Sequence, residues 1–203
     1  MRSPLSHILT FSSLALMFLT PFIGFGQNVN TNSTGTPDYY QLKAECRDAL
    51  YRKDYRNAEH DCTSALAAAD RFPELDFMQR VEVLELLGAT FIAERDFANA
   101  LPLYKRRFDL LTAHLNPNDE QVGIATRDLA EGYQALGQPD KAEPLYKRAL
   151  LIMEFQVRVT KNTLLKNRAK AELRTVQQGY ASLLRRMGRT SEANELESKY
   201  SAK

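Results

Sequence analysis

From Asp38 onward, apolar residues recur at spacings of three and four positions, which is the period of an α-helix. The strict alternation of apolar and polar residues that is typical of a half-buried β-strand is missing from this region. Short polar or Gly/Pro-containing segments interrupt the helical pattern at residues 52–54, 94–96, 137–139 and 188–190. The pattern therefore predicts an all-α domain over residues 38–203, built of helices joined by short turns.

The interruptions reveal a repeat. Each is followed by an alanine, at Ala58, Ala100, Ala142 and Ala193; the first two intervals are 42 residues and the last is 51. Twelve positions before each alanine stands another small residue: Cys46, Gly88, Ala130 and Ala181. Small residues at matched positions let two helices approach closely, and a large residue fills the space beside them. Each unit is therefore predicted to be an antiparallel helix pair that buries its remaining faces by stacking on its neighbours.

The third unit resembles a known family. Residues 128–154 read DLAEGYQALGQPDKAEPLYKRALLIME, which is similar to the tetratricopeptide repeat in the 42-residue variety found in kinesin light chains and many bacterial proteins. The resemblance implies a right-handed solenoid of about four antiparallel helix pairs. It places the units at about residues 39–72, 81–114, 123–156 and 174–203.

The resemblance also implies a binding surface. In this family the first helices of successive units line a concave groove that holds an extended or helical peptide. In this chain the corresponding positions are Tyr40, Lys43, Arg47, Tyr51, Glu82, Glu85, Arg127, Glu131, Gln134, Gln178, Ser182 and Arg185. Their mixed charge favours a polar peptide. The chain departs from the kinesin light chains at Arg127-Asp128, where those proteins typically carry two asparagines.

The N-terminus has the features of a secretory signal. Arg2 precedes a largely apolar run over residues 8–25, and small residues stand before Gln27. We expect a signal peptide at residues 1–26, cleaved after Gly26, followed by a flexible polar leader at residues 27–37. The mature protein would then be periplasmic or secreted. The alternative is that residues 8–25 are retained as a membrane anchor.

The chain has two cysteines, Cys46 and Cys62, at positions that face each other across the first predicted pair. Cysteines of exported proteins commonly pair, so one interpretation is a disulfide. The other, which we favour slightly because the Cα atoms of packed helices are often too far apart to be bridged, is two small, free core residues. His60 lies beside Cys62, but residues two apart on a helix point about 200° apart. We therefore expect no metal site and no cofactor.

Charge is distributed unevenly. Residues 27–154 carry 15 Lys and Arg against 21 Asp and Glu, whereas residues 155–189 carry nine basic residues against Glu172 alone. The extra residues between the third and fourth units fall in this basic stretch. We define the basic elbow as Arg158, Lys161, Lys166, Arg168, Lys170 and Arg174. It is interpreted either as a site for an acidic partner or anionic envelope surface, or as a solvated helix face. The aromatic residues of a nucleic-acid binder are missing.

No motif predicts catalysis: the sequence lacks a Gly-rich phosphate loop, G-x-S-x-G and H-E-x-x-H. We predict a non-enzymatic, exported protein-interaction module that scaffolds or chaperones a protein or peptide partner through the groove. One alternative is a membrane-anchored assembly protein of an envelope complex. Another is an enzyme, or an enzyme accessory, with clustered carboxylates in a closed cavity. The sequence does not indicate an oligomeric state.

Overall fold

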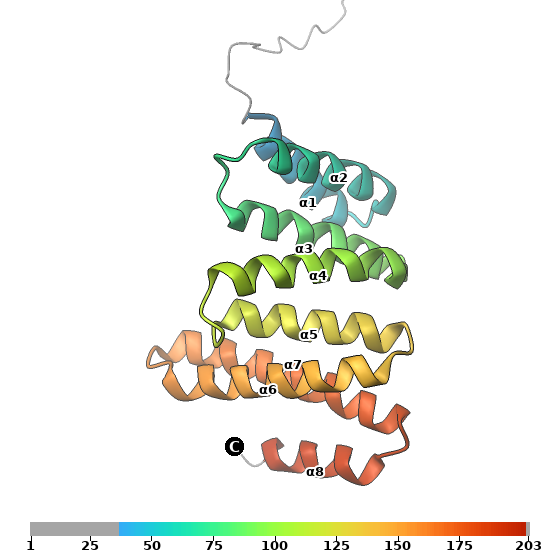
Figure 1. Cartoon of the computed structure of the whole chain (residues 1–203), viewed down its shortest axis with the longest axis vertical. Helices are drawn as coiled ribbons and strands as arrows, with labels where there is room; N and C mark the ends of the chain where they lie inside the picture. The colour runs from blue at the N-terminus through green and yellow to red at the C-terminus, as the bar shows by residue number, and fades with distance from the viewer. Residues whose placement is uncertain (1–36, 202–203) are drawn as a thin grey trace, which may run out of the picture. The chain divides into compact units, whose positions relative to one another are not determined.

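The computed structural model describes residues 37–201, and within them it contains eight α-helices and no strand (Figure 1). The predicted signal peptide, and all of the predicted leader except Pro37, lie outside these residues. The helices are α1 (Pro37–Tyr51), α2 (Tyr55–Arg71), α3 (Phe77–Ala93), α4 (Phe97–His114), α5 (Glu120–Ala135), α6 (Pro139–Val159), α7 (Thr163–Arg186) and α8 (Thr190–Ser201). The prediction of an all-α repeat fold is therefore confirmed.

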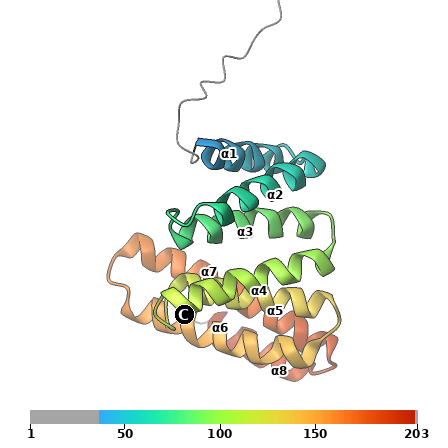
Figure 2. The same cartoon turned by 45° about the horizontal axis from the view of Figure 1, so that its top comes forward.

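Each helix packs on the next one along the chain, so that the pairs α1–α2, α3–α4, α5–α6 and α7–α8 follow one another in a stack (Figures 1 and 2). The first helices also approach one another, α1 with α3 and α5 with α7. Within residues 37–201, the backbones of the second helices do not approach one another in this way, although their side chains do, as in the ion pair of Arg106 of α4 with Asp70 of α2. The first helices therefore lie on the inner side of the stack.

The small residues of the repeat stand where helices cross closely. Cys46, Ala130 and Ala181 are fully buried, as are the alanines that follow each turn. At Gly88, an added Cβ would lie 2.6 Å from Cε1 of the Tyr104 ring, so only glycine leaves room for that ring. Tyr104 is itself 9% exposed and belongs to the core formed with Ala100 and Leu129. At this crossing, the small residue lets the two helices approach closely, and the large ring fills the space beside it.

The turn within each pair has the same backbone conformation. Lys53, Arg95, Gly137 and Gly188 all have a positive φ, of 61°, 62°, 69° and 78°. The residue after each one donates its backbone N–H to a carbonyl five positions earlier, for example Asp96 to Phe91 at 2.8 Å. This bond satisfies a carbonyl at the end of the first helix. Two of the four turns adopt the left-handed conformation without a glycine, which costs free energy.

The fourth unit is longer than its predicted boundary. α7 begins at Thr163 rather than near residue 174, and α6 continues to Val159. The additional residues that widen the last repeat interval therefore extend two helices, and only residues 160–162 connect them. The basic elbow lies on these helix extensions and their connection.

Cys46 of α1 and Cys62 of α2 are joined by a disulfide, with their Cα atoms 4.8 Å apart. Both residues are fully buried and pack against Leu87 of α3. Closing a loop of this length stabilises a protein by about 3 kcal/mol in the chain-entropy model. The bond fixes the first pair of the stack, which has a neighbouring pair on only one side.

The left-handed turns lead to a stability prediction. Replacing Arg95 by glycine should raise the free energy of unfolding by about 0.5–1 kcal/mol, because glycine adopts a positive φ without strain. Gly137→Ala should lower it by about 1 kcal/mol, although no atom lies within 4 Å of the added Cβ. Urea denaturation followed by circular dichroism measures both changes.

Glu59→Gly provides the control, since Glu59 is exposed inside α2, where glycine lowers helix stability. If Arg95→Gly destabilised the protein as much as Glu59→Gly does, backbone strain at Arg95 would be the wrong explanation.

Candidate functional site

The inner side of the stack has a hollow of about 350 Å³ between α1 and α3. It is lined by Lys43, Arg47, Glu82, Glu85, Leu86 and Ala89, and the first four of these are groove residues predicted above. The Lys43 ammonium lies 2.6 Å from a Glu82 carboxylate oxygen and over the Tyr39 ring. This hollow therefore has a polar wall of both charges and a small apolar floor.

The predicted groove tyrosines lie outside the lining of this hollow. Tyr40 is 51% exposed and Tyr51 is 88% exposed, near the two ends of α1. The neighbouring Tyr39 is buried and donates its hydroxyl to the Gln79 carbonyl, so it anchors α1 on α3. Tyr40 and Tyr51 are thus available to a ligand that runs beyond the hollow.

A second hollow of about 260 Å³ lies between α5 and α7. Its lining includes three predicted groove residues, Glu131, Gln134 and Ser182, with Ala135, Tyr146, Gly179 and Arg186. The Tyr146 hydroxyl donates to Oε1 of the Gln134 side chain at 2.7 Å, and Nε2 of the same side chain donates to the Ser182 hydroxyl at 3.4 Å. A Cβ at position 179 would lie 2.8 Å from the Tyr146 ring, so Gly179 allows this arrangement.

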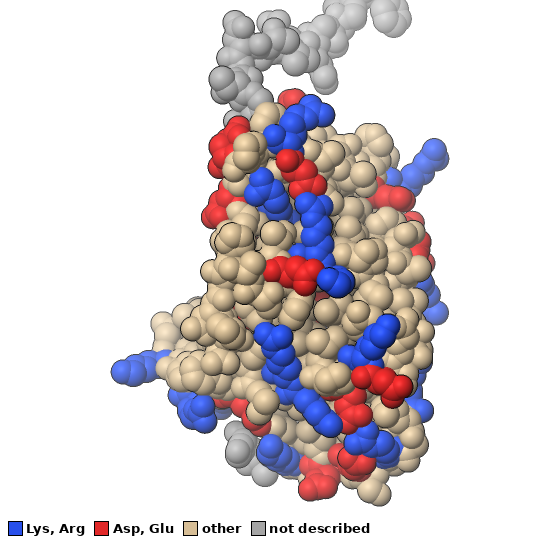
Figure 3. Space-filling model, viewed as in Figure 1, with Lys and Arg blue, Asp and Glu red and all other residues tan. Residues whose placement is uncertain are grey.

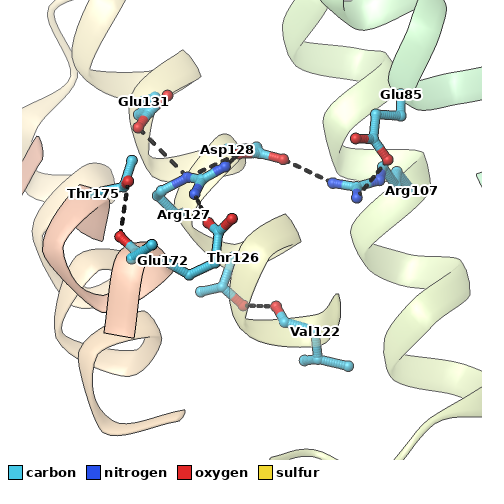
Figure 4. Close-up of polar contacts among 10 residues, drawn as sticks. Glu85, Arg107, Val122, Thr126, Arg127, Asp128, Glu131, Glu172 and Thr175 are labelled. Atoms are coloured by element: carbon cyan, nitrogen blue, oxygen red, sulfur yellow. Dashed lines mark hydrogen bonds and ion pairs between the residues drawn. The ribbon is translucent and has the colours of Figure 1, made fainter. Parts of the chain in front are cut away.

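A charged network connects the helices between the two hollows (Figure 4). The Asp128 carboxylate accepts from Arg107 at 2.7 Å and from Arg127 at 2.7 Å. Arg107 also donates to Glu85 of α3, and Arg127 donates to Glu172 of α7. Four helices, α3, α4, α5 and α7, are therefore tied through one carboxylate.

This network determines what the predicted arginines can do. The Arg127 side chain is 14% exposed and its guanidinium is occupied by Asp128 and Glu172. Arg185 is likewise held by Glu197 of α8, at 2.6 Å. Both arginines support the groove, whereas Arg47 makes no ion pair within residues 37–201 and faces a hollow. Gln178 is exposed and lines neither hollow.

Two members of the network were missed by sequence reasoning, Arg107 and Glu172. Arg107 is 3% exposed and stands in the repeat column that holds Ala65 and Ala149 in other units. The signal in the sequence was a long cationic side chain at a repeat position where two other units have alanine. Glu172 was identified only as the one acidic residue of the basic stretch. A single acidic residue in such a stretch also indicates a specific cationic partner, which here is Arg127.

Glu131 is the one described carboxyl group whose pKa is shifted upward. Burial raises its pKa to about 6, against the opposing effect of Arg127. The folded chain therefore binds a proton at Glu131 more readily than the unfolded chain, and this group lowers stability as pH rises from 4.5 to 6. It lies in an open hollow and not in a closed cavity. Within residues 37–201, no three His, Cys, Asp or Glu side chains are placed to hold a metal ion.

The elbow cations differ in their surroundings. Arg168 lies 3.4 Å from Glu120 of α5, which is the kind of internal ion pair expected of a solvated helix face. Arg158 lies over the Phe155 ring. Arg158, Lys161, Lys166, Lys170 and Arg174 make no ion pair within the described part of the chain. The elbow therefore keeps most of its positive charge free of internal neutralisation.

Residues 79–154 match the family model for the tetratricopeptide repeat. This span contains all of α4 and α5 and the greater parts of α3 and α6, and hence the central network. Residues 79–154 are therefore tetratricopeptide repeats.

Solved structures share the repeat fold at low sequence identity. The apo form of RapI is 13% identical, with a TM-score of 0.70 over 84% of this chain and 57% of that chain. The Q17M structure of nearly identical TPR-like repeats of a putative kinesin light chain from Podosopora anserina is 15% identical, with a TM-score of 0.50. It covers 80% of this chain and 92% of that chain. The present chain thus spans little more than half of RapI. No curated protein matches it by sequence.

The central network of this repeat protein can be tested by removing the charge of Asp128. Asp128→Asn should lower the free energy of unfolding by about 3 kcal/mol, because the buried Arg107 guanidinium loses its best-placed counter-charge. Chemical denaturation at pH 7 measures the loss.

Asp109→Asn is the matched control, since Asp109 pairs with Lys105 at the same distance of 2.7 Å but on the surface. It should leave stability almost unchanged. Equal losses in the two variants would mean that burial of the pair is not what makes Asp128 important.

Proposed function

We propose that this protein is a non-enzymatic, exported interaction module that scaffolds or chaperones a partner by holding a polar peptide segment in its groove. The observation that carries the proposal is the pair of hollows on the inner side of the stack. Seven of the twelve predicted groove residues line them: Lys43, Arg47, Glu82, Glu85, Glu131, Gln134 and Ser182. Tetratricopeptide repeats bind protein or peptide partners, so this surface is the natural place for one.

The chemistry of the hollows favours a polar peptide with both charges. Arg47 offers a cation at the first hollow, and Glu131 and Gln134 offer acceptors and an amide at the second. Between them, the Arg107–Asp128–Arg127 network holds the helices in fixed positions. A rigid surface loses little conformational entropy on binding, which leaves more of the contact free energy for affinity.

Export is supported by two independent features. The N-terminal segment has the three parts of a signal peptide in the right order: a basic residue, an apolar run, and small residues before the predicted cleavage site. The Cys46–Cys62 disulfide fits an oxidising compartment, where such bonds persist. None of the helices in residues 37–201 is long and apolar enough to span a membrane. The alternative proposal is an envelope-complex assembly protein that keeps residues 8–25 as its anchor.

The arrangement of polar groups supports a non-enzymatic role in this proposal. Within residues 37–201, the one carboxyl group with a raised pKa, Glu131, lies in an open hollow beside an arginine. Perturbed groups that act in catalysis are usually gathered in an enclosed pocket with a second reactive group. The polar groups of the inner side are instead spread over two separate shallow hollows, which suits recognition of an extended chain.

Site-specific photo-crosslinking tests the groove. A benzophenone side chain at Ala89, in the first hollow, should crosslink a partner peptide in extracts of the native compartment. The same group at Thr63, on the exposed face of α2, should not. Mass spectrometry identifies the partner and the crosslinked segment.

Arg47→Glu, combined with the benzophenone group at position 89, should reduce the crosslinking yield at least tenfold, because it reverses the unpaired charge of the hollow. Crosslinks of equal yield from positions 63 and 89 would contradict binding in the groove. Lys53→Glu, outside both hollows, provides the matched charge reversal.

N-terminal sequencing tests export. Protein purified from the producing cell should begin at Gln27 and fractionate without detergent. A mature chain that retains residues 8–25 and is released only by detergent would contradict cleavage and support the anchored alternative.

A further inference from the structure

A third concavity lies between α6, α7 and α8 and contains none of the predicted groove residues. Its volume of about 440 Å³ exceeds that of either hollow. Binding sites for small molecules typically measure about 300–1,000 Å³. It is lined by Glu154, Val157, Arg158, Lys170, Leu173, Arg174, Gln177, Lys199 and Tyr200. The cavity therefore combines a large positive charge with apolar walls.

The positive charge of the cavity is mostly uncompensated. Four cations face one carboxylate, and that carboxylate, Glu154, already accepts from the Tyr200 hydroxyl and from Lys199 at 3.4 Å. Arg158, Lys170 and Arg174 have no acidic partner within residues 37–201. Cations gathered in a concave surface raise the local concentration of anions. The lining residues therefore favour an anion with more than one negative charge.

Gln177 adds a second, independent indication. Its side chain is 6% exposed and lines the cavity, and its Nε2 is buried without a hydrogen-bond partner. A buried donor that lacks an acceptor costs free energy, and such groups are rare in folded proteins. Because Gln177 lines the cavity, a rotation of its amide that brings Nε2 to the cavity surface lets an oxyanion there accept from the amide and the guanidinium groups together.

We propose that the cavity binds a phosphate monoester group attached to an apolar organic body. At neutral pH this group carries about 1.5–2 negative charges, which matches an excess of cations better than a single carboxylate does. Arg158 and Arg174 supply planar donor pairs for its oxygens, and Lys170 supplies a point charge. Val157 and Leu173 contact the organic part. This site goes beyond peptide binding in the groove and does not depend on it.

The phosphate group could come from a soluble metabolite or from a lipid headgroup. Features of the elbow bear on the second source. Leu164 and Leu165 are 77% and 52% exposed at the start of α7, and Val159 is 45% exposed at the end of α6. Lys and Arg side chains project from the same end of these helices (Figure 3). Exposed apolar residues beside cations are typical of segments that enter an anionic membrane surface.

Isothermal titration calorimetry of the full mature chain with phenyl phosphate tests the site. We expect binding that weakens at higher salt, and a loss of affinity of at least about tenfold in Lys170→Gln/Arg174→Gln. Gln177→Leu should weaken binding without any change of charge. Lys161→Gln/Lys166→Gln is the matched control, because it removes two elbow cations that lie outside the cavity. Thermal melts establish that each variant is folded.

The proposal is overturned if phenyl phosphate does not bind at low salt, or if the control pair weakens it as much as the cavity pair. It is also overturned if phenylacetate binds as tightly, since the site would then recognise a monovalent carboxylate. Arg174→Gln alone serves if the double variant fails to fold, because Arg174 is exposed.

Vesicle sedimentation distinguishes the two sources. A lipid source predicts retention on phosphatidylcholine vesicles that contain phosphatidic acid, a monoester, above retention on vesicles with phosphatidylglycerol, a diester. Leu164→Ser/Leu165→Ser should then reduce retention while leaving phenyl phosphate affinity unchanged. Binding of phenyl phosphate without retention supports a soluble ligand. Equal retention on both lipids contradicts recognition of a monoester on membranes.

Discussion

The close crossing of neighbouring helices, with a tyrosine ring against a glycine, is the constraint on which this structure depends. Tyr104 fills the space that Gly88 leaves, and Tyr146 does the same against Gly179 in the next unit. A helix pair cannot bury both of its faces alone, so each pair is stable only when its neighbour approaches to this distance. Tyr146 and Gly179 also line the hollow between α5 and α7, so this contact shapes that hollow directly.

The close packing has an electrostatic consequence at the centre of the stack. Arg107 occupies a column that holds alanine in two other units and is 3% exposed, so its charge must be met inside the protein. The Asp128 carboxylate neutralises this charge and also accepts a hydrogen bond from Arg127, which in turn donates to Glu172. The arginines of the inner side consequently have two roles. Arg107 and Arg127 hold the helices, whereas Arg47 remains free for a ligand.

The longer last interval explains why the C-terminal part differs from the rest. Extending α6 and α7 adds cations to both helices without adding carboxylates apart from Glu172. Because Glu172 is committed to Arg127, Arg158, Lys170 and Arg174 have no acidic partner within residues 37–201. The two proposed binding surfaces are thus chemically distinct: shallow hollows of mixed charge on the inner side, and a larger cationic cavity beside α8.

The sequence by itself predicted stacked helix pairs, because small residues recur at matched positions where helices must cross closely, and the resemblance to the tetratricopeptide repeat implied the solenoid. The resemblance also indicated seven of the residues that line the hollows, since it implies which positions of the first helices face the groove. The tertiary structure alone decided which cations are available. Lys43 and Arg127 hold equivalent places in the repeat pattern, and each is paired, Lys43 with Glu82 and Arg127 with Asp128 and Glu172. Arg47, four positions after Lys43 on the same helix, makes no ion pair within residues 37–201. The cavity of α6, α7 and α8 likewise depends on three helices meeting, and a linear pattern does not encode distances between residues as far apart as Arg158 and Lys199.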